Sequence, residues 1–300
     1  MGDFKGHAMP GSCLLLIGIW WAFWALRRYF VCRRSGTRFV STASYNCGWS
    51  CGRIGVIPIE SLLKIGLSAF GMFAEITLNL PHLAMGIVQH ATMYFFFMTS
   101  GVVDLCFHYG MPIPPGTDYA ALALALTVEG LLFVNHLHGR SELDVQLHLL
   151  LSYVVFSTVL VLLLEIKFQR SALLSLARSY LTILQGSWFW AVGVILYGHG
   201  NPNTAWTGDK PMEVMQATIY FSWHAAVIFI IMLVITLIMS RIYRGEGPPY
   251  RNGAELPMTR LGNGNGKGVE SYQPLTREFH DEESDIEFEQ PVDKSQPTAS

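Results

Sequence analysis

Seven long apolar stretches constrain this chain more than any other feature of its sequence. Crossing the hydrocarbon core of a bilayer takes about 20 apolar residues in a helix, because every backbone polar group must be satisfied within the protein there. Only 14% of the residues are charged, against about 25% in a typical soluble domain. The sequence therefore predicts an all-α polytopic membrane protein, a bundle of seven transmembrane helices. The expected spans are residues 11–26, 62–80, 86–106, 119–134, 145–166, 180–197 and 216–239.

The basic residues predict how this bundle is oriented, because cytosolic loops carry an excess of Lys and Arg. An odd number of spans places the two ends of the helical domain on opposite sides of the membrane. With the N-terminus in the lumen or exterior, that side carries only Lys5, Arg140 and Lys210. We therefore expect a lumenal N-terminus and a cytosolic C-terminus. The basic residues then on the cytosolic side are Arg27, Arg28, Arg33, Arg34, Arg38, Arg53, Lys167, Arg170, Arg178, Arg241 and Arg244.

The composition changes after about residue 244. Residues 1–244 are expected to form the seven-helix domain, with a cytosolic loop at about 27–61. Residues 245–300 are rich in Gly and Pro and then acidic, with few large apolar residues. Such a segment cannot bury enough apolar surface to offset the entropy of ordering. We expect it to be a disordered acidic tail in the cytosol.

Several ionisable residues fall within or beside the predicted spans, on the side expected to be lumenal. Ionisable groups in lipid are costly and usually face the bundle interior, where they mark a functional site. Residues four apart share a helix face, and residues seven apart nearly do, which pairs Asp144 with His148 and Glu129 with His136. The candidate ligand or metal residues are His90, Glu129, His136, His148, His224 and Asp144. The sequence does not decide whether His136 or His138 faces the interior.

Three hypotheses follow from this group of residues. The first is a non-enzymatic protein in which the histidines and acids form a structural or ligand-binding polar cluster, with Asp144 able to cap the fifth span. The second is an enzyme, either a metal-dependent hydrolase or a haem oxidoreductase, since imidazole and carboxylate ligands suit zinc and paired histidines suit haem. Against it, the spacing matches no H-E-x-x-H motif. The third is a proton-coupled carrier with Asp104 and Glu129 as relay groups.

The remaining polar residues of the spans have simpler interpretations. Glu75 lies in the lumenal half of the second span. Asp104 lies toward the cytosol, where we expect it to pair with a basic residue. Glu165, beside Lys167, is expected to be an ordinary interface residue at the end of the fifth span. Trp188 lies inside the sixth span and is expected to pack there.

Several motifs in order resemble the transmembrane protein 45 family. They are "FKGHAMPGS" near the N-terminus, "QHATMYFFFMTSGVVD" in the third span, "HLHGRSELDVQLHLLL" at the turn between the fourth and fifth, "LQGSWFWAVG" in the sixth and "SWH" in the seventh. The similarity runs from residue 4 to about 240. It implies a seven-span protein of Golgi, endosomal or lysosomal membranes, with links to innate immunity, proliferation and epidermal differentiation. It supplies no catalytic residues.

The tail carries two short motifs that fit this setting. Residues 272–275, "YQPL", match the Y-x-x-Φ sorting signal, in which Tyr272 and Leu275 would bind a clathrin adaptor. Ser284 lies in an acidic run and is a candidate for phosphorylation, which would add further negative charge. We therefore expect the lipid bilayer and clathrin-adaptor proteins as partners, and no nucleic acid. The plasma membrane is a further expected location.

Overall fold

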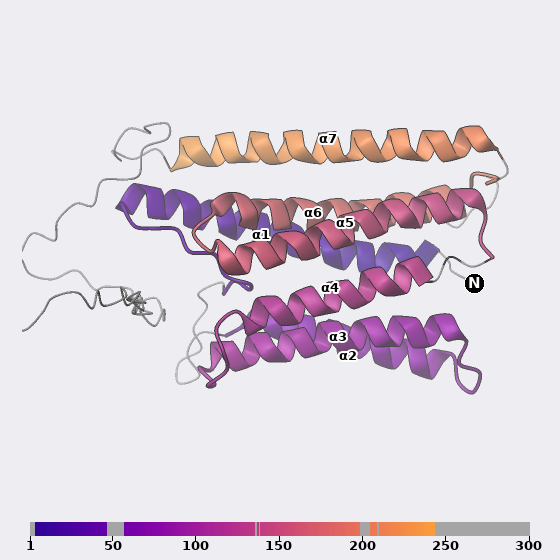
Figure 1. Ribbon diagram of the computed structural model, residues 1–300, viewed down its shortest axis with the longest axis horizontal. Helices are drawn as coiled ribbons and strands as arrows, with labels where there is room; N and C mark the ends of the chain where they lie inside the picture. The colour runs from indigo at the N-terminus through magenta and orange to yellow at the C-terminus, as the bar shows by residue number, and fades with distance from the viewer. Residues whose placement is uncertain are drawn as a thin grey trace, which may run out of the picture. The chain divides into compact units, whose positions relative to one another are not determined.

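The computed structural model describes residues 4–46, 57–135, 137, 139–198, 205–208 and 210–243, and all regular structure in them is helical. The chain divides into two units, Met1–Pro249 and Tyr250–Ser300. The second unit lies outside the described residues, so the expected disorder of the tail stays a prediction. The helices of the first unit (Figure 1) are α1 Phe4–Ser35, α2 Ile59–Leu78, α3 Met85–His108, α4 Thr117–Asn135, α5 Glu142–Lys167, α6 Ala172–Tyr197 and α7 Pro211–Ile242.

Each predicted span corresponds to one of these helices, which confirms the predicted fold class. Six of them are long and apolar enough to cross a membrane. The other is α3, which has 24 residues and packs against both α2 and α4. The chain is an integral, multi-pass membrane protein.

Two helix boundaries differ from the prediction and matter for the site. Helix α1 continues to Ser35, so the first part of the loop predicted at 27–61 is helical. Helix α6 begins at Ala172 rather than at residue 180, because polar residues in its first turns lower the local hydropathy. Ser171 caps it by accepting a hydrogen bond from the backbone N–H of Leu174 at 3.4 Å. Arg178 therefore lies inside a helix and not in a loop.

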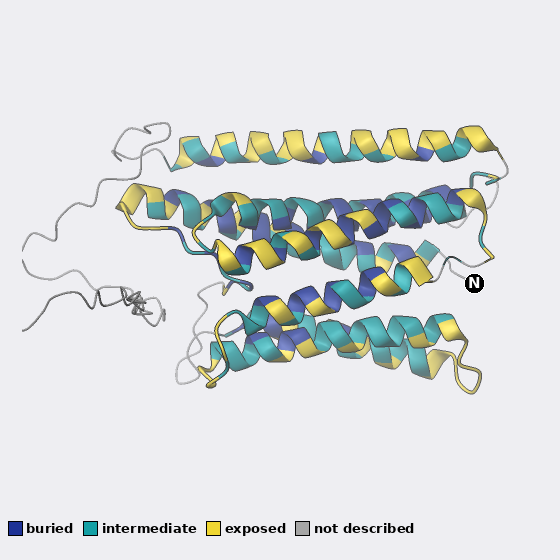
Figure 2. Ribbon diagram, in the orientation of Figure 1, coloured by how far each residue is buried: buried dark blue, intermediate teal, exposed yellow. Residues whose placement is uncertain are grey.

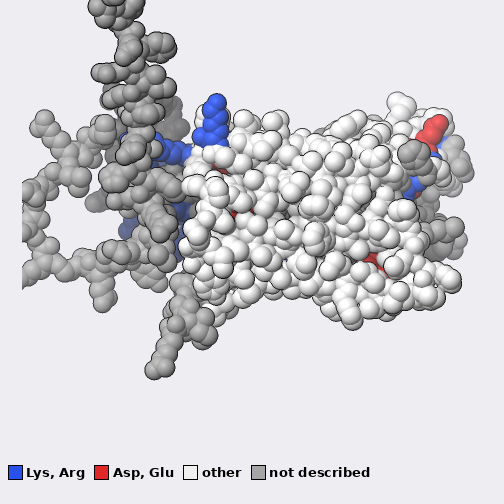
Figure 3. Space-filling view, turned by 60° about the horizontal axis from the view of Figure 1, so that its bottom comes forward, with Lys and Arg blue, Asp and Glu red and all other residues white. Residues whose placement is uncertain are grey.

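The helices pack in the order α2, α3, α4, α5, α6, α1, each against the next, and α7 lies against α5, α6 and α1. Helix α6 is the most enclosed of those that could cross a membrane: 56% of its apolar stretch is buried, against 17% in α7 and in α2. Figure 2 shows the same difference, with exposed residues along much of α7. The exposed residues of α7 include many large apolar side chains, as expected of a helix that faces lipid. In Figure 3 the surface between the two ends of the bundle carries few charges, which gather toward the ends.

Helices α1 and α6 approach each other through glycines. A Cβ atom built on Gly186 would lie 2.5 Å from the backbone nitrogen of Leu15 and 2.7 Å from the carbonyl oxygen of Gly11. On Gly11 it would lie 2.8 Å from the carbonyl oxygen of Gly186. Gly18 and Gly193 make similar close contacts farther along the same two helices. Small residues let membrane helices approach closely and gain van der Waals contact.

We predict that Gly186→Ala destabilises the bundle, since the added methyl group would meet backbone atoms that cannot rotate away. Overpacking of this kind typically costs about 1–3 kcal/mol. The measurement is the midpoint of thermal unfolding in detergent. The control is Gly66→Ala in α2, where a Cβ meets nothing within 4 Å. Equal midpoints for the two variants would contradict the close approach of α1 and α6.

Candidate functional site

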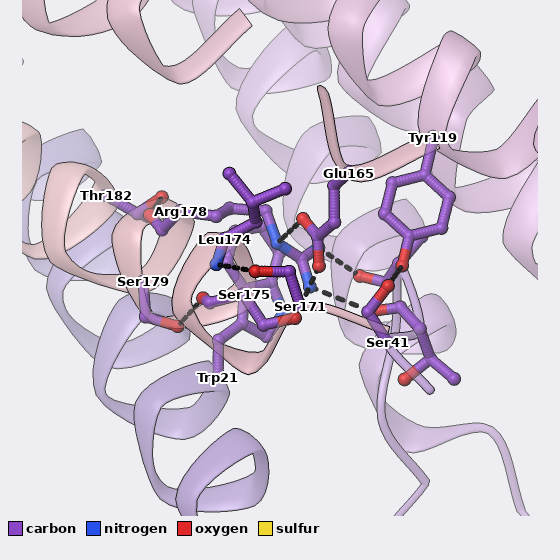
Figure 4. Close-up of polar contacts among 12 residues, drawn as sticks. Trp21, Ser41, Tyr119, Glu165, Ser171, Leu174, Ser175, Arg178, Ser179 and Thr182 are labelled. Carbon is purple, nitrogen blue, oxygen red and sulfur yellow. Dashed lines mark hydrogen bonds and ion pairs between the residues drawn. The ribbon is translucent and has the colours of Figure 1, made fainter. Parts of the chain in front are cut away.

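A fully buried ion pair joins α5 to α6 (Figure 4). Glu165 and Arg178 have no exposed side-chain surface, and the Arg178 Nε atom lies 3.1 Å from Glu165 Oε2 as a charge contact. The Ser175 hydroxyl donates a hydrogen bond to the other Glu165 oxygen at 2.6 Å. The connection between the two helices is short, so the end of α5 faces the start of α6. The prediction of Glu165 as an ordinary interface residue beside Lys167 is therefore wrong.

Arg178 also holds the segment that connects α1 to α2. Its Nη1 and Nη2 atoms donate hydrogen bonds to the carbonyl oxygens of Ala43 and Thr42, each at 2.8 Å. The guanidinium carbon lies 4.5 Å from the ring centroid of Trp21 in α1, a favourable cation–π distance. One side chain thus joins α1, α5, α6 and the connecting segment. We call this group the Arg178 network, made of Trp21, Thr42, Ala43, Glu165, Ser175 and Arg178.

The connecting segment is folded against the helices at this end of the bundle. The Ser41 backbone N–H donates to the carbonyl of Gln169 at 2.7 Å, and the Tyr119 hydroxyl donates to the Ser41 hydroxyl at 2.9 Å. Phe39 and Tyr45 are buried in the same segment. Burial raises the pKa of the Tyr45 phenol, so this side chain stays neutral and adds no charge to its surroundings. Residues 39–45 are therefore part of the core.

Glu60, at the start of α2, makes a second set of contacts with the same segment. Its carboxylate accepts hydrogen bonds from the indole nitrogens of Trp20 at 3.0 Å and Trp21 at 2.8 Å. It also accepts one from the backbone N–H of Tyr45 at 2.8 Å. Trp21 thus contacts both Glu60 and Arg178. The chemistry of these groups is that of a structural anchor, since Glu60, Glu165 and Arg178 make their contacts with other groups of the chain.

At the opposite end of α5, the structure brings together the expected pair Asp144 and His148. The His148 Nδ1 atom lies 2.8 Å from Asp144 Oδ1, and Arg140 contacts the other carboxylate oxygen at 2.8 Å. The His148 ring lies 5.7 Å from that of His7 in α1. The cap of α5 is Ser141, whose hydroxyl accepts from the Asp144 N–H at 3.3 Å, so the interpretation of Asp144 as the cap is wrong.

The other candidate histidines make separate contacts. His90 in α3 lies with its Nδ1 atom 3.1 Å from Glu75 Oε1 in α2. His224 in α7 has its ring 5.8 Å from that of Trp188. Trp188 is fully buried and donates its indole N–H to the Leu147 carbonyl at 3.1 Å, so it packs inside the bundle as expected.

The metal hypothesis requires several of these histidines and acids to converge on one point, where an ion could bind. In residues 4–46, 57–135, 137, 139–198, 205–208 and 210–243, no group of three or more His, Cys, Asp or Glu side chains could hold a metal ion. His136 and His138 lie outside the described residues. Zinc or haem binding therefore stays a prediction, without a converging set of ligands in the part of the chain described.

Two further acids lie inside the bundle. Asp104 in α3 pairs with Lys64 in α2 at 2.5 Å, which confirms the expected basic partner. Glu129 in α4 is buried and accepts a hydrogen bond from the side-chain amide of Gln185 in α6 at 3.0 Å. This contact links α4 directly to α6.

Sequence reasoning missed Gln185 and the role of Arg178, although α6 carries a signal for both. A membrane-spanning helix usually turns its polar residues toward the bundle interior. Arg178 and Gln185 are seven residues apart and so lie close together on one face. The buried polar residues of α6 all lie near this face, because they recur about once per helical turn. They are Ser175, Arg178, Ser179, Thr182 and Gln185.

The fold and these contacts define a multi-pass helical membrane protein with a polar interior. The model of a family of unknown function, DUF716, matches residues 115–237, a range that contains Glu129, Glu165, Arg178 and Gln185. The chain is similar to transmembrane epididymal protein 1A of Mus musculus, 28% identical over 267 residues, which cover 84% of this chain and 85% of that protein. The chain is also similar to transmembrane epididymal protein 1 of Rattus norvegicus. The two are 28% identical over 261 residues, which cover 81% of this chain and 84% of that protein. The Homo sapiens protein of that name is 30% identical over 142 residues, which cover 46% of this chain and 51% of that protein.

We predict that Arg178→Met frees the connecting segment, because the segment loses two charge-assisted hydrogen bonds and Glu165 is left as an unpaired buried charge. Removing one partner of a buried ion pair costs about 3–5 kcal/mol. The measurement is the rate of trypsin cleavage after Arg38 in membranes opened on both sides, which should rise strongly.

The matched control is Arg170→Met, which removes an exposed arginine near the same turn and should leave this rate unchanged. Equal rates for Arg178→Met and the unmodified protein would contradict the anchoring of the segment by Arg178.

Proposed function

We propose that this chain is a non-enzymatic multi-pass protein of endomembranes, of the transmembrane protein 45 type, whose helical bundle is a stable scaffold. The observation that carries the proposal is the set of contacts that Arg178 makes. Its nitrogens meet Glu165, Thr42 and Ala43, and its guanidinium covers Trp21. A buried charge that meets four protein groups stabilises one arrangement and leaves little freedom to bind a substrate.

The other charged contacts favour the same conclusion. Asp104 is held by Lys64, Asp144 by Arg140 and His148, and Glu60 by two indoles and a backbone N–H. An active site needs side chains that converge on a common point where a reacting atom can lie. In the described residues these acids lie in separate contacts with other groups of the chain, which favours the structural alternative over a hydrolase or an oxidoreductase.

We further propose that the end of the bundle holding the Arg178 network faces the cytosol. The basic residues at the end of α1, in the connecting segment and at the turn between α5 and α6 lie there, and their excess favours the cytosolic side. The N-terminus would then be lumenal and the tail cytosolic. In that position Tyr272 and Leu275 would be accessible to clathrin adaptors and Ser284 to kinases, consistent with Golgi, endosomal or lysosomal membranes.

We predict that Tyr272→Ala moves the protein toward the plasma membrane, because the adaptor loses the tyrosine that it binds. The measurement is the fraction of full-length tagged protein labelled at the surface of intact cells. Tyr250→Ala is the control, since this tail tyrosine is followed by "RNG" and does not fit Y-x-x-Φ.

An antibody to a C-terminal tag should reach it when only the plasma membrane is permeabilised, which checks the premise that the tail is cytosolic. The proposal of adaptor sorting fails if Tyr272→Ala and Tyr250→Ala give the same surface fraction. The proposed orientation fails if the tag stays protected.

A further inference from the structure

The contact between Glu129 and Gln185 in the bundle interior is incomplete. The Gln185 amide nitrogen donates to Glu129 Oε1 at 3.0 Å. Within the described part of the chain, the second carboxyl oxygen, Glu129 Oε2, and the amide oxygen, Gln185 Oε1, are both buried without a hydrogen-bond partner. Glu129 is 4% exposed and Gln185 is 0% exposed. Leaving a buried polar atom unsatisfied costs about 1–3 kcal/mol, and more for a charged group.

A single proton would complete this contact. If Glu129 is ionised, both unsatisfied atoms are acceptors and neither can satisfy the other. If Oε2 carries a proton, it becomes a donor, and the free acceptor on its existing partner is Gln185 Oε1. An acid and an amide can form two hydrogen bonds side by side in this way, N–H to one carboxyl oxygen and O–H to the amide oxygen. The protonated pair then leaves neither oxygen unsatisfied.

The surroundings of the pair favour the neutral form. Phe133 follows Glu129 by one turn of α4, and Phe189 follows Gln185 by one turn of α6, with ring centroids 5.7 Å apart. These rings cover the side of the pair toward the end of the bundle where α5 begins. Beside Glu129, a Cβ on Gly130 would meet the Phe156 ring of α5 at 2.8 Å. An ionised carboxylate among such side chains is strongly disfavoured.

Most titratable groups of the elements around this pair make contacts of their own or stand at other levels of the helices. Cys13 of α1 is a free thiol near the level of Gln185, since the neighbouring Gly186 packs against Gly11 and Leu15. In the described chain, the polar side chain that contacts the Glu129 carboxyl is Gln185. The groups concerned are Asp104 of α3 with Lys64 of α2, Asp118 at the start of α4, Asp144, His148 and Glu165 of α5, Arg178 of α6, His7 and Cys13 of α1, and His224 of α7.

We propose that Glu129 and Gln185 form a proton-binding site that joins α4 to α6. The assembled bundle holds one proton on Glu129, shared as a hydrogen bond with Gln185. Loss of that proton leaves a carboxylate facing an amide oxygen, and the direct link between the two helices weakens. The bundle is then more stable when the site is occupied, so the stability that this pair contributes is present at low pH and is lost as pH rises past the point where Glu129 releases its proton.

The test uses the full-length protein in detergent, with the midpoint of thermal unfolding measured from acidic to alkaline pH. Glu129→Gln keeps the shape and replaces the O–H donor with an N–H donor that does not titrate. We expect it to match the unmodified protein at acidic pH and to exceed it at alkaline pH by at least about 3 °C. Glu75→Gln is the matched control, because Glu75 is partly exposed beside His90, and it should show no such gain.

Infrared spectroscopy gives an independent measurement that does not depend on unfolding. A protonated carboxyl has a C=O stretching band that a carboxylate lacks, and we expect this band at neutral pH, lost in Glu129→Gln. Gln185→Leu should shift the band, since it removes the partner of the O–H group, and this variant decides the question if Glu129→Gln does not fold. The proposal is overturned if the unmodified protein shows no protonated carboxyl at neutral pH, if Gln185→Leu leaves the band unmoved, or if Glu129→Gln lowers the midpoint equally at all pH values.

Discussion

A guanidinium inside a membrane helix must be matched by acceptors, and much of this structure follows from how Arg178 is matched. Glu165 supplies the opposite charge from the next helix, but one carboxylate cannot satisfy a planar group with five donors. Thr42 and Ala43 supply two backbone carbonyls, and Trp21 supplies the face of its ring. The connection between α1 and α2 is therefore held inside the fold, where a simple surface loop would not be. Through Trp21 and Tyr45, Glu60 extends the same contacts to the start of α2.

Helix α6 can occupy this central position because its faces differ in chemistry. One face carries Gly186 and Gly193, which let α1 approach closely. Another carries Ser175, Arg178 and Gln185, which meet α5, the connecting segment and α4. In lipid, helix association depends on close packing and polar contacts rather than on burial of apolar surface from water. Helix α6 supplies both kinds of contact, whereas the largely exposed α7 meets the bundle along a narrower face.

The helices were predictable because a membrane span needs a long apolar stretch, and each expected stretch coincides with most of one helix. The pairs Asp144–His148 and Asp104–Lys64 were also within reach of sequence reasoning, from helical spacing in the first case and from the cost of an isolated buried acid in the second. Glu165–Arg178 was not, because hydropathy placed the start of the sixth span at residue 180. That boundary left Arg178 in a loop, where it was counted among many cytosolic basic residues. Contacts between distant parts of the chain, such as Glu129 with Gln185 or Glu60 with Trp21, depend on the packing order of helices, which hydropathy does not specify.

The arrangement of α1, α5 and α6 depends on Glu165 and Arg178 acting as a unit, and a double-mutant cycle tests this most directly. Unfolding would be measured in detergent for the unmodified protein, Glu165→Leu, Arg178→Met and the double variant. Each single substitution leaves a buried charge without its partner, while the double substitution leaves none. We predict that the double variant loses clearly less stability than the sum of the two single losses. A double variant whose loss equals that sum would show that the two side chains act independently, and would contradict the account.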